Sequence, residues 1–147
     1  NHNNTAVAIQ EQLKPLGIEV TLMNTDAPTH FGFLEQKTGD FDVARAGWIA
    51  DYKDPENFLA LCKTGTGNNY SSYSDAGYDE LLAKAAAEAD PAARMASLSQ
   101  AEAIGVARDL CIVPLMFYSY HSVVSDNVAC WEPNVMDIHP TRFLSKE

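Results

Sequence analysis

The chain has 147 residues, of which 46% are hydrophobic and 10% aromatic, and its formal net charge is −10 at pH 7. A chain of this length can bury one hydrophobic core, whereas the excess of carboxylates excludes a nucleic-acid-binding surface, which needs clustered Lys and Arg. The charge also argues against binding to an anionic membrane surface, and no apolar run approaches the roughly 20 residues that a membrane-spanning helix needs.

The first third of the chain alternates helical and strand-like patterns. Apolar residues recur at spacings of three and four over residues 6–16, which predicts a helix that Gly17 ends. Residues 18–22 predict a strand, residues 28–37 a short helix that begins at a proline, and residues 41–46 a second strand. This order favours right-handed crossovers and a mostly parallel sheet flanked by helices, which is an α/β fold.

Helical signals dominate the middle of the chain. Residues 51–74 are loop-like, with a short apolar turn inside them, and residues 78–89 predict a helix. Asp90 and the proline after it predict the start of another helix, which runs to about residue 108. Its inward-facing residues are expected to be Met95, Leu98, Ala101 and Gly105. Residues 111–120 then predict an apolar strand, which 122–128 continue or pair with.

Three cysteines, Cys62, Cys111 and Cys130, can form at most one disulfide, and their spacings fit no CxxC metal or redox motif. Because Cys111 lies in an apolar run, we interpret it as a small buried residue. The number of cysteines alone leaves the redox compartment undecided.

Motifs of known catalytic sites do not occur in the sequence. There is no GxSxG, HExxH, P-loop or GxGxxG, and the four histidines share no spacing that would place two on one helical face. Each histidine is interpreted as a surface or loop residue. We therefore expect no enzyme, no catalytic residue, no metal site and no cofactor.

The segment after the second predicted strand is the most informative, because ligands of open α/β sheets bind beyond the carboxyl ends of strands. Trp48 offers a flat apolar wall with one N–H donor, and Gly47 and Ala50 leave room for a ligand to approach the backbone. Arg45 and Asp51 bracket Trp48 with opposite charges, as a zwitterion would require. The alternative is that Trp48 belongs to the core, Asp51 caps a turn and Arg45 forms a surface ion pair. The residues alone do not decide between the two.

The order and spacing of residues 41–52, followed by Pro55 and the Phe–Leu pair at 58–59, resemble the peptide-binding family of ABC-importer extracytoplasmic solute-binding proteins, in particular the oligopeptide-binding proteins. The likeness covers most of residues 4–120 and resumes clearly at 112–118. It implies a two-lobed, periplasmic-binding-protein-like fold. Such a protein encloses a peptide between its lobes and delivers it to the membrane subunits of an importer.

The family's chains are several times longer, so the resemblance implies that this chain is a fragment. Residues 1–119 would form part of the C-terminal ligand-binding lobe, and residues 120–147 would return toward the missing N-terminal lobe. The exposed edge of such a lobe could also pair with a second copy in a homodimer. The expected location is the periplasm, or the outer face of the membrane as a lipoprotein in a Gram-positive organism.

Matched position by position, the resemblance implies roles for seven residues. Asp51 would pair with the α-ammonium of the peptide, and Arg45 would receive the carboxylate of a short peptide. Tyr118 would reach the cleft with its hydroxyl, and Asn69 would lie in a loop near the cleft. Backbone groups or an apolar wall would come from Gly47, Ala50 and Trp48.

Two departures from the family pattern bear on the ligand. Gln36 stands where oligopeptide-binding relatives carry a second cleft arginine, and Ile49 stands where some relatives carry a disulfide-bonded cysteine. The family's disulfide is therefore absent, and the three cysteines offer no obvious substitute. Since family members also bind nickel chelates, haem or sugars, a non-peptide solute is one alternative function. A self-associating interaction module is another.

Overall fold

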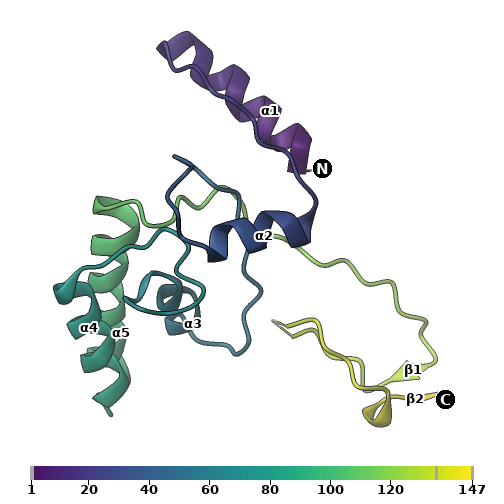
Figure 1. Cartoon of the computed structure of the whole chain (residues 1–147). Helices are drawn as coiled ribbons and strands as arrows, with labels where there is room; N and C mark the ends of the chain where they lie inside the picture. Colours follow the sequence, from purple (N-terminus) through teal and green to yellow (C-terminus); the bar gives the residue numbers. More distant parts are fainter. Residues whose placement is uncertain (1, 135, 147) are drawn as a thin grey trace. The chain divides into compact units, whose positions relative to one another are not determined.

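The computed structural model (Figure 1) describes residues 2–134 and 136–146 of the chain. The chain divides into two compact units, Asn1–Thr38 and Gly39–Glu147, which are described separately. The boundary that the sequence places near residue 120, between a lobe segment and a returning segment, stays a prediction.

The first unit begins with α1 (His2–Leu13), which continues as a 3₁₀ turn, η1 (Lys14–Leu16). The helix ends where the sequence predicts, because Gly17 adopts a φ of 77° and donates its N–H to the carbonyl of the first residue of η1. Gln10 on α1 donates from Nε2 to the carbonyl of Val20 at 2.7 Å. This bond ties the segment after Gly17 to the helix.

The second helix of this unit, α2 (Ala27–Glu35), confirms the short helix predicted near Pro28. Asp26 caps it by accepting a hydrogen bond from the backbone N–H of Thr29 at 2.9 Å, and Pro28 lies in the first turn, where its missing N–H is tolerated. Leu34 is its buried residue, with 1% of its surface exposed.

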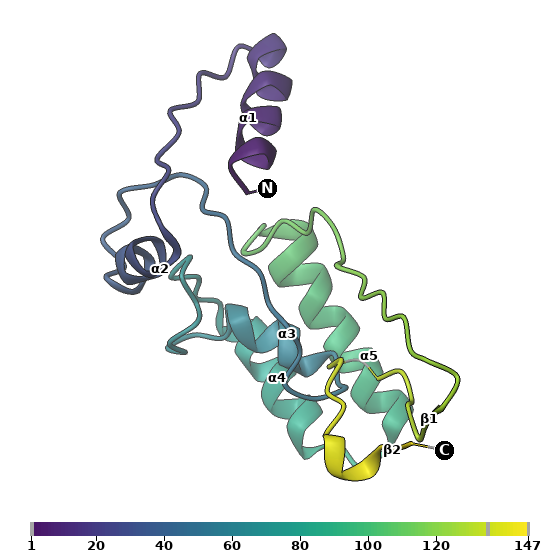
Figure 2. The ribbon, with the colours of Figure 1, turned by 90° about the vertical axis from the view of Figure 1, so that its right-hand side faces the viewer.

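The second unit is built on helices. A short helix α3 (Glu56–Leu59) and a 3₁₀ turn η2 (Ala60–Cys62) precede α4 (Ala76–Ala87) and α5 (Pro91–Glu102), which lie side by side (Figures 1 and 2). A π-helical turn, η3 (Ala103–Arg108), continues α5. The predicted helices thus form where expected.

Capping fixes the starts of α4 and α5. The side chain of Asp75 accepts from the backbone N–H of Tyr78 at 2.7 Å, and that of Asp90 accepts from the N–H of Ala93 at 2.8 Å. Each carboxylate satisfies a backbone N–H that has no partner inside the helix. The start signal at Asp90 is confirmed.

The core of the second unit lies between α3, α4, α5 and η2. The buried residues that form it are Leu59, Cys62, Tyr78, Leu82, Ala85, Leu98 and Ala101. Tyr78 crosses this core and donates its hydroxyl to the carbonyl of Leu59 at 2.6 Å. The expectation that Met95 faces inward is wrong: 46% of its surface is exposed, because the buried face of α5 is formed by Leu98 and Ala101.

A disulfide joins Cys62 in η2 to Cys111, three residues beyond the end of η3. This finding corrects two expectations, that the cysteines offer no substitute for the family's disulfide and that Cys111 is only a small buried residue. The two residues are 49 positions apart, but Cys62 lies in the helical core and Cys111 packs against the same core, so that their Cα atoms are 6.1 Å apart, within disulfide range. Cys130 is free and exposed.

The described residues contain one sheet, in which β1 (Val128–Ala129) pairs antiparallel with β2 (Ser145–Lys146). The segments 18–22, 41–46 and 111–120, predicted as strands, carry no strand in the structure. A strand exists only where a neighbour pairs with its N–H and C=O groups, and the described part of the chain supplies these segments with none. The predicted parallel sheet is therefore unconfirmed.

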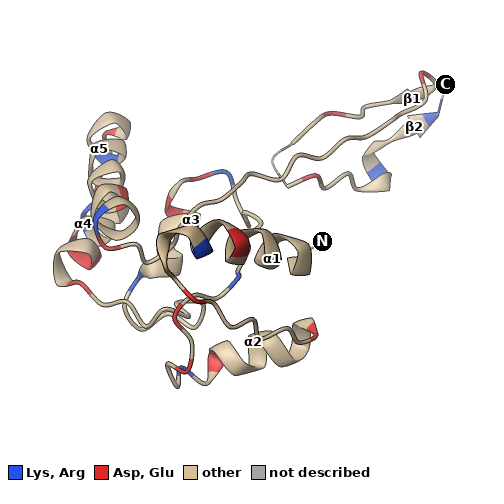
Figure 3. Cartoon of the chain, turned by 90° about the horizontal axis from the view of Figure 1, so that it is seen from above, with Lys and Arg blue, Asp and Glu red and all other residues tan. Residues whose placement is uncertain are grey.

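Charged residues are dispersed over both units rather than gathered in one patch (Figure 3). Within residues 2–134 and 136–146, no helix is both long and apolar enough to span a bilayer. The same residues contain no group of three or more His, Cys, Asp or Glu side chains arranged to hold a metal ion.

Candidate ligand-binding site

Asn57, which is 95% buried, organises the segment that carries most of the predicted site residues. Its side-chain oxygen accepts two hydrogen bonds, from Trp48 Nε1 at 2.7 Å and from the backbone N–H of Asp51 at 3.1 Å. One oxygen thus fixes both the indole ring and the backbone of Asp51. Sequence reasoning missed Asn57. The only signal in the sequence was an isolated amide side chain next to the short apolar turn, and that turn forms α3 in the structure.

Trp48 is half-buried, and its only donor is used inside the protein rather than offered to a ligand. Ala50 is buried, with 6% of its surface exposed, and Asp51 is exposed. Among residues 2–134 and 136–146, no hydrogen bond or ion pair to the Asp51 carboxylate is found. The part of the Trp48 side chain that stays partly exposed is therefore its apolar ring, and the Asp51 side chain is exposed to solvent.

The turn that follows Asp51 is anchored to α5. Arg94 donates two hydrogen bonds to the Asp54 carboxylate, at 2.8 and 2.9 Å, and Asp54 also accepts from the backbone N–H of Glu56 at 2.9 Å. The hydrogen bond from Arg94 holds the pKa of Asp54 below its ordinary value. Two-pronged pairing of this kind fixes orientation as well as distance. The loop that presents Asp51 is thus held at α3 and at α5.

Arg45 and Tyr118 are 73 positions apart, and the structure brings them together. Arg45 Nη2 donates to the Tyr118 hydroxyl at 3.4 Å. The same guanidinium lies beside Gly47, where a Cβ atom would come 3.6 Å from Arg45 Nη2. Arg45 is exposed, and Tyr118 has 63% of its surface exposed. Two of the predicted site residues therefore meet on an open surface.

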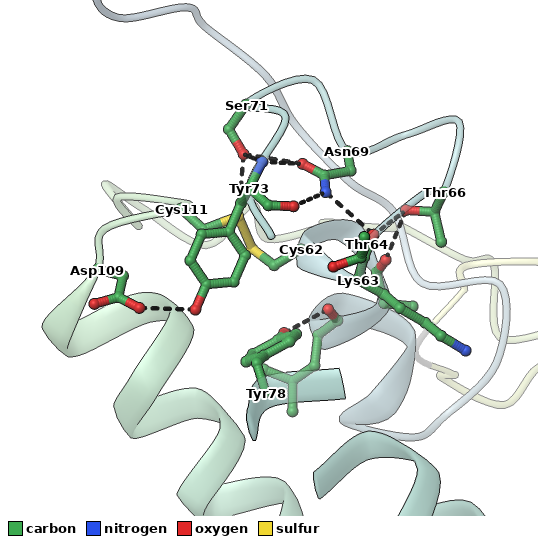
Figure 4. Close-up of a disulfide and its surroundings, with 12 residues drawn as sticks. Cys62, Lys63, Thr64, Thr66, Asn69, Ser71, Tyr73, Tyr78, Asp109 and Cys111 are labelled. Atoms are coloured by element: carbon green, nitrogen blue, oxygen red, sulfur yellow. Dashed lines mark hydrogen bonds between the residues drawn. A yellow bond between two sulfur atoms is a disulfide. The ribbon is translucent and has the colours of Figure 1, made fainter. Parts of the chain in front are cut away.

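Asn69, the seventh predicted site residue, is 98% buried in a loop of its own (Figure 4). Its amide nitrogen donates to the carbonyls of Lys63 and Tyr73 at 3.1 and 2.8 Å. Its oxygen accepts from the backbone N–H of Tyr73 and from Ser71 Oγ. Both ends of the amide are therefore used to shape the loop, and these bonds link it to neither Arg45 nor Asp51.

The same loop is tied to the end of η3 beside the disulfide (Figure 4). The Tyr73 hydroxyl donates to Asp109 Oδ2 at 2.8 Å, and Arg108 pairs with the same carboxylate at 2.6 Å. Hydrogen bonds from Arg108 and from Tyr73 lower the pKa of Asp109 to about 2. Burial, together with the bond to Asp109, raises the pKa of Tyr73 to about 12.

Tyr118 also borders a hollow of about 420 Å³ against the C-terminal segment. Its lining is aromatic and polar, and consists of Tyr118, Tyr120, Ser122, Trp131, Pro133, Asn134, Asp137 and His139. Trp131 and His139 stack with their ring centroids 3.6 Å apart. The hollow shares Tyr118 with the Arg45–Tyr118 contact.

Comparison with known families gives a specific match. Residues 1–70 match the family described as bacterial extracellular solute-binding proteins, family 5 Middle. The chain is 37% identical over 105 residues to the periplasmic murein peptide-binding protein MppA of Escherichia coli, covering 71% of this chain and 19% of that protein. It is 36% identical over 118 residues to the periplasmic oligopeptide-binding protein OppA of Salmonella typhimurium, covering 80% of this chain and 21% of that protein.

Solved structures agree with these relatives. The crystal structure of a periplasmic oligopeptide-binding protein, OppAIV from Borrelia burgdorferi, matches 99% of this chain with a TM-score of 0.76 and 32% identity. The match covers 29% of that structure, and this chain spans about a fifth of the length of the curated relatives named above. The expected resemblance to peptide-binding proteins of ABC importers is confirmed.

Proposed function

We propose that this chain, which is similar to periplasmic peptide-binding proteins and matches the family of bacterial extracellular solute-binding proteins over residues 1–70, forms one wall of a peptide-binding cleft. The whole protein would deliver peptides to the membrane subunits of an ABC importer. The observation that carries the proposal is the loop held by Asn57, which leaves Asp51 exposed beside the half-buried ring of Trp48. The opposite wall would come from a region of the whole protein that corresponds to the part of the relatives outside the match with this chain.

We assign the two charged residues to the two ends of a peptide. Asp51 would pair with the α-ammonium group; at about 3 Å and an effective dielectric constant near 20, the attraction is at most about 5 kcal/mol before desolvation is subtracted. Arg45 would receive the carboxylate of a short peptide, with the Tyr118 hydroxyl 3.4 Å away as a further donor.

Three further residues would contact the ligand between these ends. The indole face of Trp48 would form an apolar wall, because its N–H group is already bonded to Asn57. Gly47 and Ala50 would offer backbone groups to an extended peptide, as an added strand does. Asn69 would act from a distance by holding its loop in shape, since both ends of its amide are used there.

The disulfide supports a location outside the cytoplasm. Structural disulfides persist in oxidising compartments and are rare where glutathione and thioredoxin keep thiols reduced. The Cys62–Cys111 bond therefore fits the periplasm, which the names of the relatives also give, or the outer face of the membrane as a lipoprotein. No transition metal or other cofactor is part of this proposal.

A comparison of two proteins tests whether the cleft needs both walls. The full-length gene product should bind short peptides with free termini at micromolar concentration in calorimetry. The 147-residue chain alone should show no binding at millimolar peptide, because half a cleft loses contacts and the exclusion of water together. Micromolar binding by the chain alone would overturn the two-wall claim.

Two alternative functions are each supported by one observation. A relative from Escherichia coli that is 32% identical over 117 residues is named as a probable deoxycholate-binding protein, so a non-peptide solute is one of them. Self-association is the other, because segment 113–123, which pairs with no strand among the described residues, exposes apolar residues, among them Phe117 at 95% and Val123 at 104%. A dimeric mass of the chain in light scattering would favour self-association, and a monomeric mass would exclude it.

A further inference from the structure

The candidate site has two parts, the loop with Trp48 and Asp51 and the segment that carries Tyr118. Both parts are attached to one short helical unit, α3 with η2. Asn57 in α3 accepts hydrogen bonds from Trp48 and from Asp51, and so holds one part. Cys62 in η2, five residues further along, is bonded to Cys111, from which the chain leads to Tyr118. The disulfide is thus the covalent link between α3–η2 and the second part of the site.

The segment between Cys111 and Tyr118 has few other restraints. At its start, the backbone N–H of Cys111 donates to the carbonyl of Gly105 at 2.8 Å, Cys111 Sγ lies 3.3 Å from Ser71 Oγ, and Cys111 and Ile112 pack against the core. Beyond that point, Val113 to Tyr118 are exposed and, among the described residues, form no turn or strand hydrogen bonds. Tyr118 is seven residues beyond Cys111, and an extended chain of that length reaches up to about 23 Å, so the position of Cys111 decides where Tyr118 can lie.

From this arrangement we propose that the Cys62–Cys111 disulfide positions Tyr118 against Arg45 and thereby sets the ligand affinity of the site. The inference rests on the proposed function, because it concerns the same site. The disulfide touches no ligand in this proposal. It acts through Tyr118, by fixing the start of the 111–118 segment to the unit that also holds Trp48 and Asp51.

Other contacts hold the helices together without the disulfide. The core between α3, α4 and α5 buries Leu59, Tyr78 and Leu98, and Arg94 pairs with Asp54 just before α3. Cys62 belongs to this core and Cys111 packs against it, but the contacts of Leu59, Tyr78 and Leu98 and the Arg94–Asp54 pair do not require the bond between the two sulfur atoms. Loss of the bond should therefore loosen the 111–118 segment more than the helical core. A positioning role can therefore be separated from a purely structural one.

A double-mutant cycle in the full-length gene product provides the first readout. Calorimetry would measure the Kd of a peptide with free termini for wild type, for Cys62→Ser with Cys111→Ser, for Tyr118→Phe, and for all three substitutions together. Removal of the disulfide should raise Kd about fivefold or more, and should add little once Tyr118→Phe is present, since coupled residues are not additive. Cys130→Ser, at the free exposed cysteine, is the matched control and should leave Kd unchanged.

A distance measurement provides the second readout and needs no ligand. Spin labels at Val43→Cys and Phe117→Cys, both exposed positions, would report the separation of the two parts of the site in a Cys130→Ser background. We expect a narrow distance distribution with the disulfide and a broad one without it.

The outcomes separate the inference from the proposed function. Equal distance distributions, an unchanged Kd, or a disulfide effect that is fully additive with Tyr118→Phe would each overturn the positioning role. Failure of the wild-type protein to bind any peptide would overturn the proposed function alone, because the distance measurement still tests the positioning.

Discussion

Gly105 lies so close to Tyr78 that a Cβ atom at residue 105 would stand 2.6 Å from Tyr78 Cε2. The ring of Tyr78 is fully buried and cannot retreat, because its hydroxyl is bonded to the carbonyl of Leu59. The π-helical turn η3 can therefore approach α4 only with a glycine at this position.

Replacement of this glycine should destabilise the second unit. Gly105→Ala forces either the Tyr78 ring or the turn to move, and overpacking of this kind costs about 1–3 kcal/mol. Gly32→Ala is the matched control, because Gly32 lies within α2 and a Cβ there meets no atom within 4 Å. The control should be neutral or stabilising by about 0.5–1 kcal/mol. Urea denaturation measures both; a Gly105→Ala protein as stable as wild type would refute the packing claim.

Loss of the Asn57 side chain should affect both the stability and the site. Asn57→Ala removes the acceptor for Trp48 Nε1–H and for the backbone N–H of Asp51, and an unsatisfied buried donor costs about 1–3 kcal/mol. We expect lower resistance to urea, altered tryptophan fluorescence and weaker peptide binding. Asn68→Ala, at an exposed neighbour of Asn69, is the control and should change none of these. Unaltered fluorescence in the Asn57 variant would argue against the proposed anchor.

Two tyrosines should make the stability of the folded protein decrease at alkaline pH. Burial raises the pKa of Tyr73 from 10.0 to about 12, and burial also raises the pKa of Tyr78. Because the folded pKa lies above the unfolded value, the stability from Tyr73 is fully present below pH 10 and is lost as the pH rises through about 12. Urea midpoints should therefore fall steeply between these values.

Tyr73→Phe should reduce this slope, since one of the two shifted phenols is then gone. Tyr120→Phe, which removes an exposed hydroxyl, should leave the slope as in wild type. The same slope in all three proteins would show that Tyr73 does not contribute to the alkaline loss of stability.

The helices of this protein can be predicted from the sequence because their signals are local. Asp26, Asp75 and Asp90 each accept a backbone N–H three residues further on, and a proline in the first turn marks two of these helices. Such capping involves only neighbouring residues, so a single sequence carries the information.

The disulfide and the anchor of the site depend on contacts between distant segments, which periodicity does not record. Cys62 and Cys111 lie 49 positions apart, and Arg45 meets Tyr118 across 73 positions. The predicted strands fail for the same reason, because a strand requires a partner that the described residues do not provide. Asn57 was missed since its role appears only when the loop before it folds back on α3.

The central claim is that the charge of Asp51 pairs with the α-ammonium group of a peptide. A two-by-two binding experiment tests this claim most directly. The full-length wild-type protein and Asp51→Asn would each be titrated in calorimetry with a peptide bearing a free α-amine and with its N-acetylated form. The substitution keeps the shape of the side chain but leaves the buried ammonium of the free-amine peptide unpaired, which should weaken its binding by about 2–5 kcal/mol. The N-acetylated peptide carries no such charge and should lose far less. Equal losses for both peptides would instead assign Asp51 to the shape of the Trp48 loop, and no loss for either would contradict recognition of a peptide through its amine.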